Sequence, residues 1–163
     1  MLKNLPIGSI DDQAKIGHVS GLIIDPKNGK IEALRVKTSM FFAKDKILST
    51  IDVVETEASG LVTKRQDNLV DPEELVRTHA LLAKNIPVLG QNAVTESGSQ
   101  LGRINDLLID SESWLILKYY VKSAWEDRIF SQDKLIKITE KEVVFTDNVI
   151  EKAPVTEPEA AAA

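Results

Sequence analysis

The two histidines of the chain, His18 and His79, are the first residues to test for chemistry, because an imidazole can bind a metal or transfer a proton near neutral pH. A metal site would need further ligands, and the candidates are the carboxylates Asp11, Asp12 and Asp25. No spacing among these residues resembles a known ligand set. We therefore interpret His18 as a strand-surface residue and His79 as a helix-face residue, and we predict no metal site.

Serine is the remaining candidate nucleophile. Ser49 and Ser131 occupy matching positions in two related stretches of the chain, but neither lies in a Gly-x-Ser-x-Gly turn. The glycines Gly98 and Gly102 follow no phosphate-binding pattern and instead indicate a hairpin. We interpret the serines as residues that end strands. The sequence thus predicts no catalytic residue and no cofactor, and we expect a protein that is not an enzyme.

The segment Asp25-Pro26-Lys27-Asn28-Gly29 is rich in oxygen donors, yet it lacks the alternation and the terminal glutamate of a calcium loop. Asp, Pro and Asn-Gly are turn residues, so the segment predicts a hairpin loop between two strands. In a related stretch at residues 102–122, Trp114 replaces the turn glycine Gly29, and we therefore expect a different hairpin there.

Large apolar side chains gather in two loops. Met40, Phe41 and Phe42 follow the second strand of the first unit, and Trp125 lies in the matching loop of the second unit. Such groups either close the end of a barrel, pack between the two units or bind a partner protein. These four residues are the candidate protein-binding site.

The composition limits the function further. With 163 residues, no cysteine and a net charge of −5, the chain can form neither disulfides nor cysteine-zinc sites, and it does not have the basic charge of a general nucleic-acid binder. The amino-terminal residues lack the apolar core of a signal peptide, and no apolar run reaches the roughly 20 residues that span a bilayer. We expect a soluble cytoplasmic protein.

A 21-residue stretch is written twice without a gap. Residues 17–37 recur as residues 102–122, and a weaker echo continues downstream at a slightly shorter spacing. The identical pairs are Gly17/Gly102, Leu22/Leu107, Ile24/Ile109, Asp25/Asp110, Ile31/Ile116, Val36/Val121 and Lys37/Lys122. So long a period indicates duplication of a whole small domain rather than a solenoid.

Apolar alternation and turn residues predict the same elements in both units. The strands expected in the first unit are 16–25, 30–37, 46–49, 53–57 and 61–64. Those expected in the second are 101–109, 115–122, 128–131, 136–139 and 143–146. One of the neighbours Tyr119 and Tyr120 must face the core and the other the surface. Many short strands in so few residues favour a small closed antiparallel barrel.

Asp71 as N-cap, Pro72 at the first position and Glu74 three residues after the cap predict a helix over 72–84. Residues 151–163 have two prolines and three glutamates and predict a disordered tail. The expected domains are a first barrel at 1–70, a linker helix at 71–85, a second barrel at 86–150 and the tail at 151–163.

The glycine, the strand that ends in aspartate, the turn and a second strand of the form Ile-x-x-Leu-x-Val together resemble the PRC-barrel domain. Residues 17–36 carry the motif and residues 102–121 carry a diverged copy, and the resemblance extends over 3–64 and 88–147. It implies an all-β protein of two small antiparallel PRC-type barrels in tandem.

The same family includes a barrel of the photosynthetic reaction-centre H subunit and one of a ribosome maturation factor. In members with known roles the domain binds proteins or steadies an assembly, and it has no family-wide catalytic residues. The resemblance therefore implies a non-enzymatic adaptor in the prokaryotic cytoplasm that binds a protein partner and not nucleic acid. The alternative is a small-molecule or ion site at the cleft between the barrels, and association of the chain with itself is left open.

Overall fold

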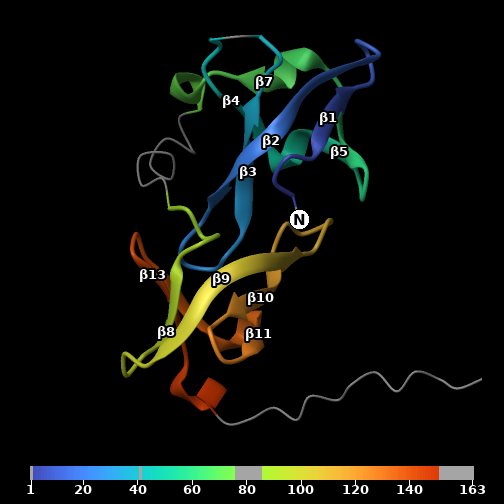
Figure 1. The fold of residues 1–163 in the computed structure, drawn as a ribbon. Coiled ribbons are helices and arrows are strands. Elements are labelled where there is room, and N and C mark those ends of the chain that lie inside the picture. Colours follow the sequence, from blue (N-terminus) through green and yellow to red (C-terminus); the bar gives the residue numbers. More distant parts are fainter. Residues whose placement is uncertain (1, 41, 76–85, 151–163) are drawn as a thin grey trace, which may run out of the picture.

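The chain folds into two β-sheets that lie one above the other in Figure 1. The computed structural model describes residues 2–40, 42–75 and 86–150. The strands of the first sheet are β1 (Pro6–Ser9), β2 (Ala14–Ile24), β3 (Ile31–Lys37), β4 (Lys46–Ser49), β5 (Val53–Glu57), β6 (Gly60–Thr63) and β7 (Leu69–Val70). Those of the second are β8 (Asn92–Thr95), β9 (Gln100–Ile109), β10 (Ile116–Lys122), β11 (Asp127–Ser131), β12 (Leu135–Ile138) and β13 (Glu142–Phe145).

Both sheets have the same strand order. The first runs β5-β6-β1-β2-β3-β4-β7, and the second, read in the same sense, runs β12-β13-β8-β9-β10-β11. Among the strands of the described residues, only β7 has no counterpart. We call the first unit, with residues 2–75, barrel 1 and the second, with residues 86–150, barrel 2. The shared topology confirms the prediction of two related β units.

Two tandem barrels fit the two sheets, but the prediction of purely antiparallel pairing is wrong. In each sheet one pair is parallel: β1 pairs with β6, and β8 pairs with β13. Parallel strands need a long connection, and here the intervening strands of the unit provide it. Among the described residues, no ladder joins the two outermost strands of either sheet. Each sheet therefore curls but stays open at its edges.

All ten predicted strands are present, with bounds that shift by two residues at most. Three strands, β1, β7 and β8, are not predicted from the sequence. Pro6 and Gly8 interrupt the apolar pattern of β1, β7 has two residues, and β8 is short. Because these strands form only by pairing with distant partners, local propensity gives little sign of them.

The strand register follows the repeat. Leu34 pairs with Leu48 in barrel 1, and the corresponding residues Tyr119 and Phe130 pair in barrel 2. Tyr119 is buried and Tyr120 half-buried, as the alternation of a strand requires.

Gly17 and Gly102 are kept in both copies because the facing strand approaches too closely for a side chain. A Cβ on Gly17 would lie 2.7 Å from the carbonyl oxygen of Lys37, and one on Gly102 would lie 2.5 Å from that of Lys122. Both distances are far below van der Waals contact, so the identity of these glycines is a packing requirement rather than a sign of a binding loop.

The prediction of a different second hairpin is wrong. The amide of Gly29 donates to the carbonyl of Asp25 over 2.9 Å, and the amide of Trp114 donates to the carbonyl of Asp110 over the same distance. Gly29 has φ 71° and Trp114 has φ 59°, so the tryptophan adopts the left-handed backbone that glycine adopts in the first copy. Tertiary packing of the buried Trp114 side chain overrides the local preference.

These two hairpins join the barrels around an approximate two-fold axis. The amide of Ile31 donates to the carbonyl of Trp114 over 2.8 Å, and the amide of Ile116 donates to the carbonyl of Gly29 over 3.3 Å. Between them, Lys30 forms an antiparallel bridge with Leu115, its own counterpart in the repeat. The contact therefore has the self-complementary form of a symmetric dimer interface.

The linker helix expected over 72–84 is not seen in the described residues. Pro72–Glu74 forms one 3₁₀ turn and Leu75 leaves it with ψ 85°, while residues 76–85 lie outside the described residues. The expected cap, Asp71, makes no capping bond, because its carboxylate accepts a 2.9 Å hydrogen bond from Nζ of Lys46. The tail at 151–163 also lies outside the described residues.

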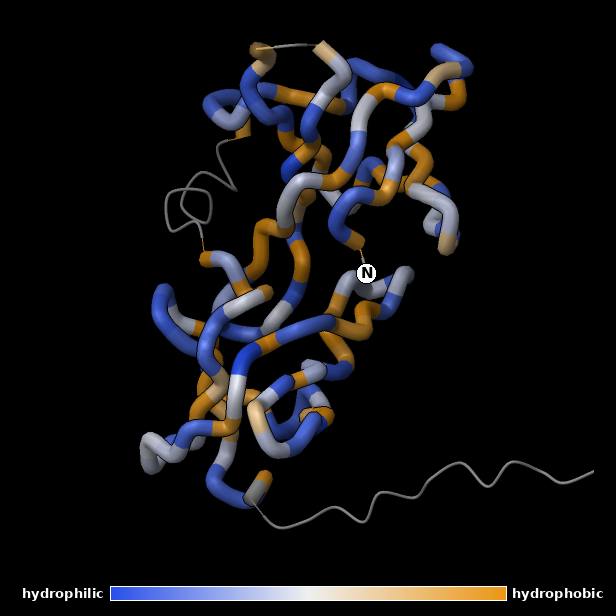
Figure 2. Tube along the Cα trace, viewed as in Figure 1, coloured by the Kyte–Doolittle hydropathy of each residue, from blue (hydrophilic) through white to orange (hydrophobic). Residues whose placement is uncertain are grey.

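One apolar core runs through both barrels. Buried side chains from β1 to β13 form a single cluster that includes Ile31, Leu34, Ile116 and Tyr119. Figure 2 shows hydrophobic segments along the strands of both sheets, with polar ones in many of the turns. The shared core and the hairpin contact hold the two barrels against each other.

Candidate interaction surfaces

The loop residues singled out from the sequence face solvent wherever the structure describes them. Phe42 is fully exposed, Trp125 is 96% exposed and Met40 is 77% exposed. They therefore neither close a barrel end nor pack between the barrels, which were two of the expected roles. Phe41 lies outside the described residues.

Two features fix these loops. Phe42 has φ 69°, a left-handed conformation that turns the chain sharply before β4. In barrel 2, the hydroxyl of Ser123 accepts a 3.0 Å hydrogen bond from the amide of Glu126 and donates to its carbonyl over 2.6 Å. This small turn holds Trp125 outward.

The structure does not bring the two loops together. β3 begins with Ile31 and β10 with Ile116, both at the contact between the barrels. Each strand then runs away from that contact for seven residues, roughly 20 Å at the usual rise of a strand. The loops that carry Phe42 and Trp125 therefore lie at opposite outer ends of the pair, and Figure 1 places the β3–β4 loop at its upper end.

His79, one of the residues considered for metal binding, lies outside the described residues. No group of three or more His, Asp or Glu side chains suited to a metal is present among the described residues. Ser131 donates a short hydrogen bond to Asp133, which lowers the pKa of that carboxyl and leaves the hydroxyl with a carboxylate rather than a histidine. Ser49 ends β4 and precedes a 3₁₀ turn, as predicted for both serines.

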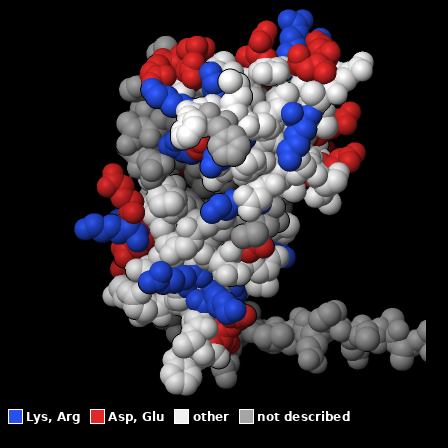
Figure 3. Space-filling model, turned by 45° about the horizontal axis from the view of Figure 1, so that its top comes forward, with Lys and Arg blue, Asp and Glu red and all other residues white. Residues whose placement is uncertain are grey.

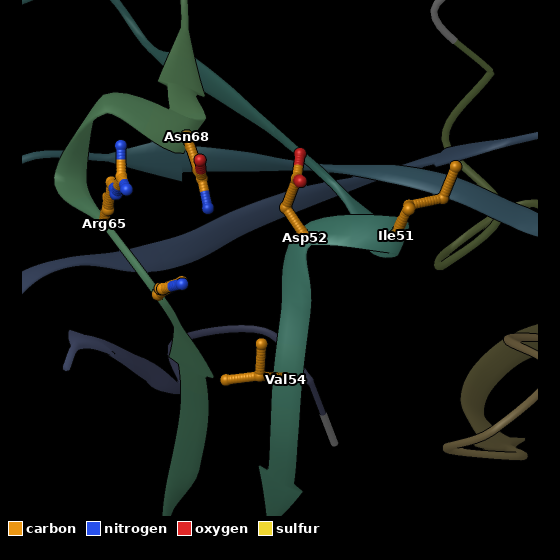
Figure 4. A pocket seen from close by; sticks show the side chains of 6 residues that line it. Ile51, Asp52, Val54, Arg65 and Asn68 are labelled. Carbon is orange, nitrogen blue, oxygen red and sulfur yellow. The ribbon is translucent and has the colours of Figure 1, made fainter. Parts of the chain in front are cut away.

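Barrel 1 also has a hollow that the sequence does not predict, shown in Figure 4. It has a volume of about 300 Å³ and is lined by Ile51, Asp52, Val54, Lys64, Arg65 and Asn68. No sequence pattern marks it, because the 3₁₀ turn η1 (Thr50–Asp52) and the turn after β6 meet only in the folded barrel.

Two of the polar side chains that line this hollow, Arg65 and Asn68, help to hold the fold. Arg65 pairs with Asp11 over 3.2 Å, and Asn68 donates to the hydroxyl of Thr63 over 2.8 Å. Thr63 in turn donates to the carbonyl of Asp52 over 2.8 Å. No nucleophile and base face each other there, and the apolar Ile51 points to the side away from Arg65 (Figure 4). The hollow has no catalytic arrangement.

A second, smaller groove lies where the barrels meet. It has a volume of about 140 Å³ and lies between residues 19–24 of β2 and residues 87–89. Pockets that hold organic ligands usually measure about 300–1,000 Å³, so this groove is too small for most of them. Lys3 is the charged residue in its lining.

Charge is distributed without a dominant patch on the face seen in Figure 3. Basic and acidic side chains alternate across the surface, and acidic ones gather along the upper rim over barrel 1. A mixed-sign surface gives no electrostatic footprint for nucleic acid on that face. No helix among the described residues has the length and apolar character to cross a membrane.

Comparison with known proteins adds one match. Residues 2–68 match the family model described as the PRC-barrel domain, which covers the first sheet up to the turn before β7. No curated protein matches the chain. The match lies within barrel 1, and the relation of barrel 2 to barrel 1 rests on the shared strand order and register.

Proposed function

We propose, from the match of residues 2–68 to the PRC-barrel domain, that the protein is a non-enzymatic interaction module that binds a protein partner. The observation that supports the proposal is the exposure of Phe42 and Trp125 on loops at the two outer ends. Exposed tryptophan and phenylalanine raise the free energy of the unbound surface and are enriched where proteins bind one another.

The proposal extends to barrel 2 as a second, diverged PRC barrel. Its support is the repeated strand order and the close approach of the facing strand to both Gly17 and Gly102. We place the role in the cytoplasm of a prokaryotic cell, on the sequence grounds given above.

The experiment uses site-specific photo-crosslinking in the native host. A photoreactive residue replaces Phe42 or Trp125, and a control places it at Ile136, an exposed apolar residue of β12. We expect a defined crosslinked protein from one or both loops and a different or empty pattern from Ile136. Trp125→Ser and Phe42→Ser should remove that crosslink from a neighbouring probe position. Patterns that are the same at all three positions contradict the proposal.

The alternative, a small-molecule or ion site between the barrels, has the groove beside residues 87–89 as its support. Its small volume makes the interaction module the function that the geometry favours. A ligand that raises the melting temperature would favour the alternative, provided that the rise is smaller in a Gly21→Leu variant that fills the groove.

A further inference from the structure

The outer face of barrel 1 is covered by the chain itself. Ile23, Ala33 and Ile47 point away from the main core, yet they are buried and form a second small cluster. Two elements cover them: β7, which pairs antiparallel with β4, and the side chain of Leu75 that follows. Ile47 is 0% exposed as a result.

The matching face of barrel 2 is not covered in this way. The counterparts of Ile23 and Ile47 in the repeat are Leu108, which is 41% exposed, and Ile129, which is 58% exposed. β11, the counterpart of β4, is the last strand of its sheet, and among the described residues its outer edge has no ladder. Barrel 2 thus presents, open to solvent, the surface that β7 occupies in barrel 1.

No segment among the described residues lies along this edge as β7 lies along β4. Residues 147–150 read Asp-Asn-Val-Ile, which echoes Asp-Asn-Leu-Val at residues 67–70, but they form a 3₁₀ turn instead of a strand on β11. The half-buried Val149 packs against the main core rather than on the outer face. Residues 151–163 contain a single large apolar residue, Val155. The described residues thus leave the edge of β11 open to a segment of another molecule.

Charge defines that segment further. In barrel 1, Lys46 of β4 pairs with Asp71, the residue directly after β7, over 2.9 Å. The counterpart of Lys46 is Arg128 of β11, whose exposed partner within the chain is Glu126 at 3.1 Å. Ala33, which lies under the cover in barrel 1, is replaced by the exposed Lys118. Two cations therefore flank the open apolar face.

We propose that the outer edge of β11 accepts an extended segment of a partner protein as an added antiparallel strand. The segment carries two adjacent aliphatic residues, which lie opposite Phe130 and Ile129, followed by an acidic residue opposite Arg128. Main-chain hydrogen bonds of the added strand supply affinity, and the aliphatic pair and the acid supply specificity. This inference rests on the proposed interaction function and names the chemical class of its partner.

The test uses the chain's own β7 sequence as the probe. A fluorescent peptide with the sequence of residues 66–75, Gln-Asp-Asn-Leu-Val-Asp-Pro-Glu-Glu-Leu, is titrated with the full chain, and binding is followed by anisotropy. We expect saturable binding. A peptide with serine in place of the Leu-Val pair should lose it, because the apolar contact is then absent.

Variants locate the binding on β11. Ile129→Lys should weaken binding about tenfold or more by placing a charge in the apolar contact. The matched control is Ile136→Lys, the same change at an exposed residue of β12, the strand at the opposite edge of the sheet, and it should bind like the parent chain. Arg128→Glu should also weaken binding, and a peptide with lysine in place of the acid should restore it.

The outcomes separate this inference from the function on which it rests. Absence of saturable binding, or equal weakening by Ile129→Lys and Ile136→Lys, overturns the β11 proposal. If the probes at Phe42 and Trp125 in the otherwise unchanged chain capture no protein while the peptide still binds, the role of these two residues is overturned instead. Melting curves confirm that the variants fold, as expected for changes at exposed positions.

Discussion

Gly29 of barrel 1 lies directly against the hydroxyl of Tyr119 in barrel 2: a Cβ on the glycine would be 2.6 Å from that oxygen. The Tyr119 hydroxyl donates to Oε1 of Gln132 over 3.1 Å, and Nε2 of Gln132 donates to the carbonyl of Asn28 over 2.5 Å. A small residue on one barrel thus makes room for a large buried residue on the other, and one polar chain links them.

The repeat shows the reverse arrangement on the other side of the axis. Trp114 is the counterpart of Gly29, and Leu34 is the counterpart of Tyr119. The two-fold relation of the hairpins therefore predicts Trp114 opposite Leu34, where barrel 1 and barrel 2 exchange roles in the contact of Gly29 with Tyr119. A copy of barrel 1 in place of barrel 2 would set Gly29 against Leu34 and leave a void, so the exchange favours pairing of unlike barrels.

Gly29→Ala should destabilise the protein more than an alanine at another glycine with positive φ. Gly98 is the control: its φ is 90°, but no atom lies within 4 Å of its Cβ position. Both changes incur about 1–2 kcal/mol of backbone strain, and Gly29→Ala adds the clash with Tyr119. Denaturant unfolding should show the difference, and Tyr119→Phe should reduce it in the double variant. Equal losses at Gly29 and Gly98 would show that the contact is not tight.

Trp114→Gly should be less destabilising than Trp114→Ala, which inverts the usual order of these residues. Both variants lose the buried indole, at about 3–5 kcal/mol, but glycine relieves the strain at φ 59°. Chemical denaturation of the three proteins tests the order. A more stable alanine variant would mean that the hairpin backbone changes when the side chain is lost.

Alanine at either of the repeated glycines, Gly17 and Gly102, should lower the stability of the protein. The loss should be larger at Gly102, because its φ of 133° adds backbone strain to the clash. Gly21→Ala should cost little, since its Cβ would meet only the flexible side chain of Arg35 at 3.3 Å. Thermal melts of the three variants provide the comparison, and a large loss at Gly21 would contradict it.

Acid should remove part of the stability of the second hairpin. Hydrogen bonds from the side chain and amide of Ser113 hold the pKa of Asp110 below its ordinary value of 3.8. Because the folded-state pKa is lowered, the contribution is present above pH 3.8 and disappears as pH falls through the folded pKa. Asp110→Asn and Ser113→Ala should both make stability depend less on pH below 3.8. Unchanged melting profiles in acid would argue against this role.

Cleavage of the connection between the barrels should leave them together. A protease site inserted within residues 76–85 allows the intact protein to be cut, and the hairpin contacts of Ile31 and Ile116 should then keep the two parts in one peak on gel filtration. Addition of Trp114→Ala should promote separation. Two independent peaks from the unsubstituted chain would show that the shared core depends on the covalent link.

Sequence alone determined much of this protein because its repeat and alternation are local signals. Residue spacing within each segment predicts the ten strands that were expected and the hairpin at residues 25–29. It also predicts that one of Tyr119 and Tyr120 is buried. The PRC-barrel assignment of the first unit rests on the same residues.

Only the tertiary structure decided how the copies differ. Trp114 keeps the hairpin of Gly29 because a distant surface holds its side chain, and Asp71 leaves its expected cap because Lys46, 25 residues away, binds it. The same reason explains why Ile47 is buried and its counterpart Ile129 is open. The burial of a strand residue depends on which distant segment packs against it. The sequence of the strand alone does not show whether such a segment is present.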